Sequence, residues 1–86
     1  NKCIIFCRMK REVDRLTEHL MALGFNAGGL HGDLEQRDRE IVIKSYRRSE
    51  IKIMVATDVA ARGLDVKDVT HVFNYHIPFD PQSYVH

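Results

Sequence analysis

Two loops of this sequence combine residue types that could hold phosphate and sugar groups. The first, Ala56–Asp65, reads ATDVAARGLD and places a hydroxyl, two carboxylates and an arginine around a glycine. Thr57 and free backbone N–H groups could hold a phosphate oxygen, and a carboxylate could accept a bond from a ribose hydroxyl. Arg62 could meet a phosphate or an acidic partner surface. The competing interpretation is a surface loop in which Asp58 is a helix N-cap.

The second loop, His31–Arg39, reads HGDLEQRDR. Gly32 lets a ligand approach the backbone, and the helix that follows begins with unpaired N–H groups that attract anions. Arg39, near the start of that helix, could pair with a phosphate. The competing interpretation is an ordinary helix start with Asp33 near the cap. The basic residues of this helix could form a binding stripe. Acidic residues interleave with them, however, and a solvated helix face is the commoner outcome of such a pattern.

Alternating strands and helices must position these loops. A continuous apolar run predicts a buried strand over Lys2–Cys7, and apolar spacings of three and four predict helices over Lys10–Leu23 and Gln36–Arg48. The remaining segments are three strands, Phe25–Leu30, Ile51–Ala56 and Val69–Tyr75, and a loop over Thr57–Asp65 with Gly63 at its bend. We expect the first of these strands to be weak, because it contains Gly28 and Gly29.

This order of elements predicts a parallel sheet with right-handed crossovers. In such sheets ligands bind at the C-terminal ends of the strands. The loops that follow those ends are Arg8–Lys10, His31–Glu35, Thr57–Asp65 and His76–Asp80. Both loops with phosphate-binding chemistry are therefore expected at one edge of the sheet.

Composition limits the class of protein. A chain of 86 residues with a net charge of +1, 44% apolar and 29% charged residues suits one soluble globular domain at most. The longest apolar run, Cys3–Cys7, is far shorter than the roughly 18 residues of a membrane span, so no membrane partner is expected. Cys3 and Cys7 are predicted to be plain strand cysteines, because four residues of strand separate them by about 13 Å. Such cysteines suit a reducing, cytoplasmic (intracellular) location.

Several catalytic motifs are absent. The sequence contains neither a G-x-x-x-x-G-K-[ST] phosphate loop nor a G-x-G-x-x-G motif, and its histidines and cysteines show no metal-binding spacing. No metal site is therefore expected in this chain. Nor does the chain hold a complete site for nucleotide hydrolysis.

Taken in order, the motifs of the chain resemble those of the second, C-terminal RecA-like domain of DEAD-box ATP-dependent RNA helicases, in helicase superfamily 2. The resemblance covers essentially the whole chain, and its most specific part is the ATDVAARGLD segment, which matches motif V almost letter for letter. The other matching segments are Ile4–Cys7 (motif IV), His31-Gly32-Asp33 with Gln36 and Arg39 (HGDxxQxxR), His71–Pro78 (VxxVxNYxxP) and Tyr84–His86 (the opening of motif VI).

The resemblance implies a fold and a set of roles. The fold is an α/β, RecA-like (P-loop NTPase-like) three-layer sandwich around a central parallel sheet. Residues 1–86 would be an incomplete domain, truncated at its C-terminus within motif VI. The family grips the sugar–phosphate backbone of single-stranded or locally unwound RNA, here through Gly32, Asp33, Gln36, Arg39 and Thr57.

The resemblance also implies an ATP site shared between two domains. Gly63 and Asp65 would meet the ATP ribose, and Arg62 and His86 would face the N-terminal RecA-like domain of the same chain. That first domain would supply the phosphate loop and hold Mg²⁺. The parent protein would couple ATP hydrolysis to local duplex unwinding, and this chain alone would be inactive.

One position departs from the family, and two other functions stay open. Met9 stands where motif IV commonly carries a Thr, and it offers no hydroxyl for a cap or polar contact. The first alternative function is a stand-alone, non-catalytic α/β module that binds a nucleotide or a partner. The second is a DNA-directed relative in the same superfamily.

Overall fold

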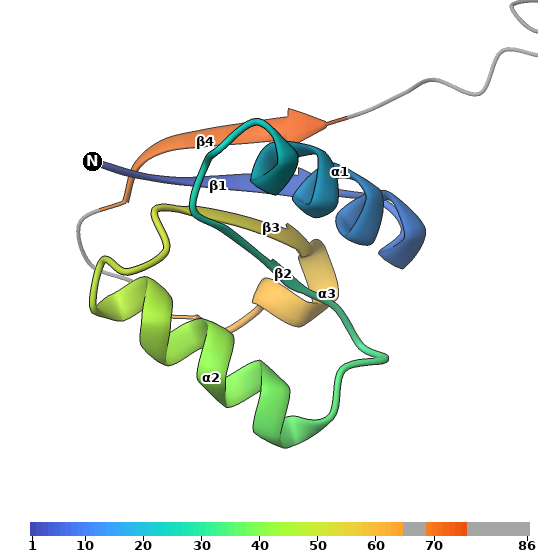
Figure 1. Cartoon of the computed structure of the whole chain (residues 1–86). Coiled ribbons are helices and arrows are strands. Elements are labelled where there is room, and N and C mark those ends of the chain that lie inside the picture. Colours follow the sequence, from blue (N-terminus) through green and yellow to red (C-terminus); the bar gives the residue numbers. More distant parts are fainter. Residues whose placement is uncertain (65–68, 76–86) are drawn as a thin grey trace, which may run out of the picture.

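A four-stranded parallel sheet forms the centre of the structure, a computed structural model that describes residues 1–64 and 69–75. The strand order is β2-β3-β1-β4, and every neighbouring pair is parallel (Figure 1). The strands are β1 (Lys2–Cys7), β2 (Ala27–Leu30), β3 (Ile53–Thr57) and β4 (Val69–Tyr75). The predicted parallel sheet is confirmed, and the predicted bounds of its first and last strands agree with those of β1 and β4.

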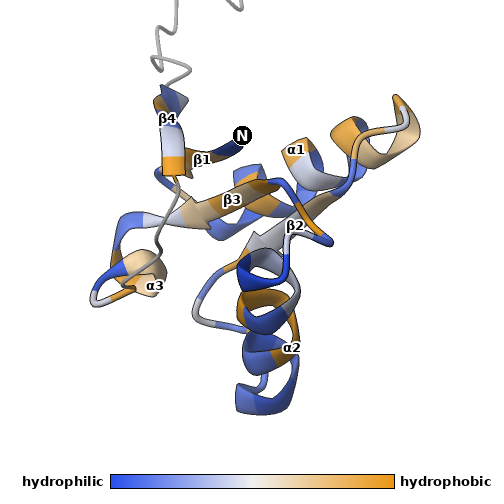
Figure 2. Ribbon diagram, turned by 90° about the vertical axis from the view of Figure 1, so that its left-hand side faces the viewer, coloured by the Kyte–Doolittle hydropathy of each residue, from blue (hydrophilic) through white to orange (hydrophobic). Residues whose placement is uncertain are grey.

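Three helices accompany the sheet: α1 (Lys10–Ala22), α2 (Gln36–Arg47) and α3 (Asp58–Ala61). Because successive strand residues point to opposite faces, β3 feeds two separate cores. Met54 packs with Leu30 on the face covered by α2 and α3, whereas Val55 packs with Val13 of α1. Helices on both faces of a sheet make three layers (Figure 2). The predicted three-layer fold is confirmed.

The two glycines of β2 allow helices to pack closely on both faces of this strand. A methyl group on Gly29 would lie 2.9 Å from Thr17 Oγ1 of α1. A methyl group on Gly28 would lie 2.9 Å from Ile51 Cδ1 and 3.2 Å from Val42 Cγ1 of α2. The strand is shorter than predicted, because it begins at Ala27 rather than Phe25. Its glycines were expected only to weaken it, but they also make room for the neighbouring side chains.

The loop predicted over Thr57–Asp65 contains a short helix, α3, so this part of the prediction is wrong. Thr57 is its N-cap, and the Thr57 hydroxyl accepts a 3.3 Å hydrogen bond from the Ala60 N–H. The interpretation of Asp58 as the cap is therefore wrong too. Ala60 is 3% exposed and belongs to the core under α2.

Tyr46 anchors α2 to the sheet. Its side chain is fully buried, and its hydroxyl donates a 3.0 Å hydrogen bond to the Cys3 carbonyl of β1. Burial, with a smaller effect of Cys3, raises the pKa of Tyr46 to about 12. Lys2 closes the same corner, because its ammonium group lies 5.4 Å from the centre of the Tyr46 ring and donates to the Arg47 carbonyl.

Both cysteines are free thiols of β1, as predicted. Cys7 is buried, and Cys3 is half-buried. Burial raises the pKa of both thiols, and for Cys7, with Glu12 adding to the effect, to about 11. A thiol with a raised pKa is a poor nucleophile at neutral pH. Among the described residues, no helix has the length and apolar character needed to cross a membrane.

Candidate functional site

An open groove of about 620 Å³ lies where three strands of the sheet end. The loops after β1, β2 and β3 all contribute to it, which confirms the expectation for these three loops. The fourth expected loop, His76–Asp80, lies outside the described residues. The residues that line it are Arg8, Met9, Lys10, Arg11, Gly32, Asp33, Thr57 and Val59.

The register of the sheet explains why these loops begin side by side. Cys7, the last residue of β1, is paired with Thr57, the last residue of β3. Leu30, the last residue of β2, is paired with Ala56, one residue before the end of β3. The three strands β1, β2 and β3 therefore end at nearly the same height along the sheet. The residues that follow them line one groove.

The groove is rich in positive charge. Arg8, Lys10 and Arg11 are all exposed, and Asp33 is the one acidic residue of the lining. The Lys10 ammonium lies 2.8 Å from Asp33 Oδ2, and this hydrogen bond together with the charge of Lys10 holds the pKa of Asp33 below its usual value. Because Lys10 neutralises the Asp33 carboxylate, this carboxylate does not repel an anion from the groove.

The three basic residues were not among the predicted site residues. The loop Arg8–Lys10 was expected at the ligand-binding edge, so its position was available from the sequence. Exposed lysines and arginines are common on any soluble surface, however, and only their meeting with Gly32 and Thr57 distinguishes them.

Met9 occupies the N-cap position of α1 and makes no side-chain hydrogen bond there. Glu12 supplies the cap instead, since its carboxylate accepts the N–H groups of Arg8 and Met9 at 3.2 and 3.0 Å. The start of α1 is therefore capped even though Met9 has no hydroxyl. Met9 also leaves a thioether, 48% exposed, in the lining of the groove.

His31 is buried beside the β2 end of the groove and is bonded to its loop. Its Nε2 atom lies 2.9 Å from Asp14 Oδ1 of α1, and its Nδ1 atom accepts a 3.2 Å hydrogen bond from the Asp33 backbone N–H. The Asp33 N–H is therefore already engaged. Asp33 could touch a phosphate only through other atoms, which narrows the role predicted for its backbone.

Two predicted phosphate-binding residues, Gln36 and Arg39, lie outside the groove lining. Arg39 Nη2 donates a 2.8 Å hydrogen bond to the Ala60 carbonyl of α3. Gln36 Nε2 donates to Glu40 Oε1 at 3.2 Å on the exposed side of α2. The N-cap of α2 is Glu35, which makes no side-chain cap bond, and Asp33 lies two residues before it, near the cap as in the competing interpretation.

The predicted ATP-facing residues follow α3. Arg62 and Gly63 are exposed, and Gly63 has φ +81° with open space where a side chain would begin. Asp65 and His86 lie outside the described residues. Within residues 1–64 and 69–75, no group of three or more His, Cys, Asp or Glu residues could hold a metal ion.

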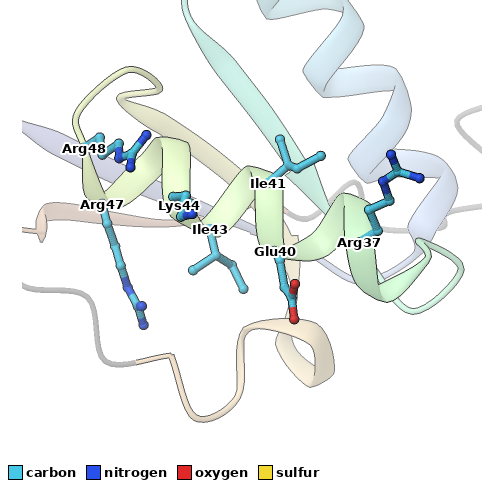
Figure 3. Close-up of a pocket in the computed structure, with 7 residues that line it drawn as sticks. All are labelled: Arg37, Glu40, Ile41, Ile43, Lys44, Arg47 and Arg48. Atoms are coloured by element: carbon cyan, nitrogen blue, oxygen red, sulfur yellow. The ribbon is translucent and has the colours of Figure 1, made fainter.

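A second open groove, of about 770 Å³, runs along α2. Its lining contains Arg37, Glu40, Ile41, Ile43, Lys44, Arg47 and Arg48. Figure 3 shows that Arg37 and Ile41 point to one side of the helix, whereas Glu40, Ile43 and Arg47 point to the other. These side chains diverge around a helix, so they do not converge on one ligand as the strand-end loops do.

Residues 1–86 match the family described as the helicase conserved C-terminal domain. The chain belongs to this family. The ATP-dependent RNA helicase CshA of Limosilactobacillus reuteri is 57% identical to this helicase domain over 83 residues, which cover 96% of this chain and 17% of that protein. The chain thus spans less than a fifth of this curated relative.

Solved structures agree with the family. A crystal structure of the Escherichia coli DEAD-box protein SrmB, bound to the regulator of ribonuclease activity A, is 39% identical with a TM-score of 0.82. The match covers 99% of this helicase domain and 50% of that chain. A DEAD box protein from Methanococcus jannaschii is 46% identical with a TM-score of 0.81, over 96% of this chain and 23% of that one. The resemblance to DEAD-box RNA helicases is confirmed.

Proposed function

We propose that this chain forms the RNA-gripping part of the C-terminal domain of an ATP-dependent DEAD-box RNA helicase. The observation that carries the proposal is the groove at the strand ends. There the cations Arg8, Lys10 and Arg11 meet the exposed backbone of Gly32 and the hydroxyl of Thr57. Cations, hydroxyls and backbone groups are the partners that nucleic-acid phosphates take without regard to sequence.

Each part of the groove has an atom to offer a phosphate. Thr57 Oγ1 accepts from the Ala60 N–H, so its own proton is available for donation. Gly32 has nothing within 4 Å of the place where a side chain would begin, which leaves its backbone open to a ligand. Lys10 is partly committed to Asp33, so Arg8 and Arg11 supply the cations that can turn toward the strand.

Gln36 and Arg39 extend this surface along the start of α2. A guanidinium group has five N–H donors, and the bond to Ala60 uses only part of them. In the proposal, Arg39 positions α3 and keeps donors for a phosphate beyond the groove. Gln36 is exposed, and its amide would give up the hydrogen bond to Glu40 in order to contact the RNA.

The proposal extends to ATP. Gly63 and Asp65 would face the ribose, and the open space above Gly63 fits that role. Arg62 and His86 would face the N-terminal RecA-like domain, which would bind ATP and Mg²⁺. When bound, ATP supplies the energy of phosphoryl transfer, and the residues described here hold the RNA strand during that step. An intracellular location stays a prediction.

Binding of RNA by the intact protein tests the proposal. The variant Arg8→Gln/Arg11→Gln should weaken binding of a mixed-sequence single-stranded RNA and lower the slope of log K against log salt concentration by about 0.7 per lost phosphate contact. The control, Lys44→Gln/Arg48→Gln, removes the same charge from the exposed face of α2 and should leave the slope near that of the unaltered protein. ATP hydrolysis stimulated by the RNA should fall in parallel in the first variant.

Three outcomes would contradict the proposal. Equal effects of the two double variants would show that only total charge matters, and the groove would not be the site. Equal affinity for DNA of the same sequence would make the RNA assignment wrong. An intact protein without ATP turnover would favour a non-catalytic module.

A further inference from the structure

The loop that lines the groove after β2 is held at two points by one face of α1. Lys10 and Asp14 lie four residues apart and so share a face of the helix. Lys10 bonds the Asp33 carboxylate at 2.8 Å, and Asp14 approaches the His31 ring at 2.9 Å. The ring thus lies between α1 and the backbone of the loop.

The hydrogen bonds define which nitrogen of His31 carries the proton. A backbone N–H can only donate, so the Nδ1 atom that receives the Asp33 N–H must present a lone pair. In a neutral imidazole the proton is then on Nε2, where it is donated to Asp14 Oδ1. Both ring nitrogens are satisfied by this one arrangement.

Burial separates this histidine from a surface ion pair. The His31 side chain is 8% exposed, whereas the Asp14 side chain is 62% exposed. The carboxylate stays in contact with water and selects the tautomer of the ring from one side. The His31 carbonyl also accepts the Leu34 N–H at 3.2 Å, so the residue braces the turn through its backbone as well.

We propose that His31 is a positioning residue for the RNA-binding loop, and that it acts as the neutral Nε2–H tautomer selected by Asp14. The Nδ1 lone pair fixes the direction of the Asp33 N–H. This direction fixes the peptide between Gly32 and Asp33, two residues that line the groove. A loop ordered in advance costs less free energy to order when RNA binds. This inference rests on the proposed RNA-binding function.

The competing role is simple packing of a buried histidine, and two variants of the intact protein separate the roles. In His31→Asn, Oδ1 takes the place of Nδ1 and can still accept the Asp33 N–H. In His31→Gln, the amide can reach toward Asp14, but no acceptor remains beside Asp33. Packing alone would favour glutamine, because its volume is closer to that of histidine.

RNA affinity should follow the acceptor. We expect His31→Ala and His31→Gln to weaken binding about tenfold, which is the effect of about 1.4 kcal/mol, and His31→Asn to retain most of the affinity. Thermal denaturation of each variant shows whether affinity merely follows stability. Binding by His31→Gln that equals or exceeds binding by His31→Asn would overturn the proposal.

Two further measurements need no RNA. Long-range ¹H–¹⁵N correlation spectra of intact protein labelled with ¹⁵N-histidine should show a protonated Nε2 and an unprotonated Nδ1 at His31. Exchange of the Asp33 amide proton should speed up in His31→Gln and stay slow in His31→Asn. A proton on Nδ1, or equal exchange in both variants, would overturn the proposal. If RNA binding itself failed, these two results would still decide the role of His31, so the two failures are distinguishable.

Discussion

The guanidinium group of Arg39 donates a 2.8 Å hydrogen bond to the carbonyl of Ala60, although 21 positions separate the two residues. The bond joins the first turn of α2 to α3. Thr57 caps α3 at its other end, so Arg39 helps to determine where the Thr57 hydroxyl lies. A residue predicted to bind phosphate directly thus also has a structural contact within the protein.

Replacing Arg39 should lower stability as well as RNA binding. We expect Arg39→Ala to reduce the free energy of unfolding by about 2 kcal/mol, because hydrogen bonds to charged groups are stronger than neutral ones. Urea denaturation of the intact protein measures this change. The control is Arg37→Ala, which removes an exposed arginine from the same turn. Unchanged stability in Arg39→Ala would mean that the bond to Ala60 contributes nothing.

Gly32→Ala should separate binding from folding. The added methyl group would meet nothing within 4 Å, so the free energy of unfolding should stay within about 0.5 kcal/mol of its original value. In the proposed complex the same methyl group would stand where the RNA backbone approaches, so affinity for single-stranded RNA should fall. Filter binding and urea denaturation check the two halves of this prediction.

The matched control for that variant is Gly29→Ala, in the same strand-and-loop segment. Its methyl group would lie 2.9 Å from Thr17 Oγ1 and 3.1 Å from Val13 Cγ1. Overpacking of this kind costs about 1–3 kcal/mol, so this variant should lose stability. An equal loss of stability in the two variants would contradict the prediction that a methyl group at Gly32 meets no other atoms.

The ion pair in the groove should be visible by titration. Lys10→Gln should raise the pKa of Asp33 toward its usual value of 3.8, because the hydrogen bond and the charge of Lys10 are its main causes of lowering. The stability that this pair contributes is present above pH 3.8 and is lost as the pH falls through the lowered pKa. Carboxyl ¹³C NMR follows the titration, and Arg11→Gln should leave the pKa of Asp33 closer to its original value.

Alkaline pH should loosen the anchor between α2 and β1. The pKa of Tyr46 is raised from 10.0 to about 12, so its contribution to stability is complete below pH 10 and is lost as the pH rises through 12. Tyr46→Phe should cost about 1 kcal/mol at neutral pH, because the hydrogen bond to the Cys3 carbonyl is lost. Denaturation between pH 8 and 11 should show a smaller decline in the variant than in the original protein. An equal decline would assign the alkaline sensitivity to other groups.

Periodicity predicted most of the fold because the strands and long helices bury repeating apolar positions. β1 and β4 have the predicted bounds, and α1 and α2 end within one residue of them. The helix α3 could not be found this way, since four residues are too few to show a helical repeat. Its cap at Thr57 looked like any polar loop residue.

The candidate site was predicted only in part, for a similar reason. Gly32, Asp33 and Thr57 meet in the groove, because the ends of parallel strands are aligned by the sheet. The bonds of Arg39 to Ala60 and of His31 to Asp14 depend on distances across the fold, which no local pattern contains. Arg8 and Arg11 could be recognised as candidate site residues only after the fold placed them beside Gly32 and Thr57.

The pairing of β1 on both sides has a consequence for motion near the groove. Cys7 is in register with Thr57 on one neighbour and with Tyr75 on the other. A slip of β1 by one residue would break two ladders and turn every side chain to the wrong face. The ends of the strands therefore keep a fixed spacing, and the loops after β1 and β3 begin at fixed positions relative to each other.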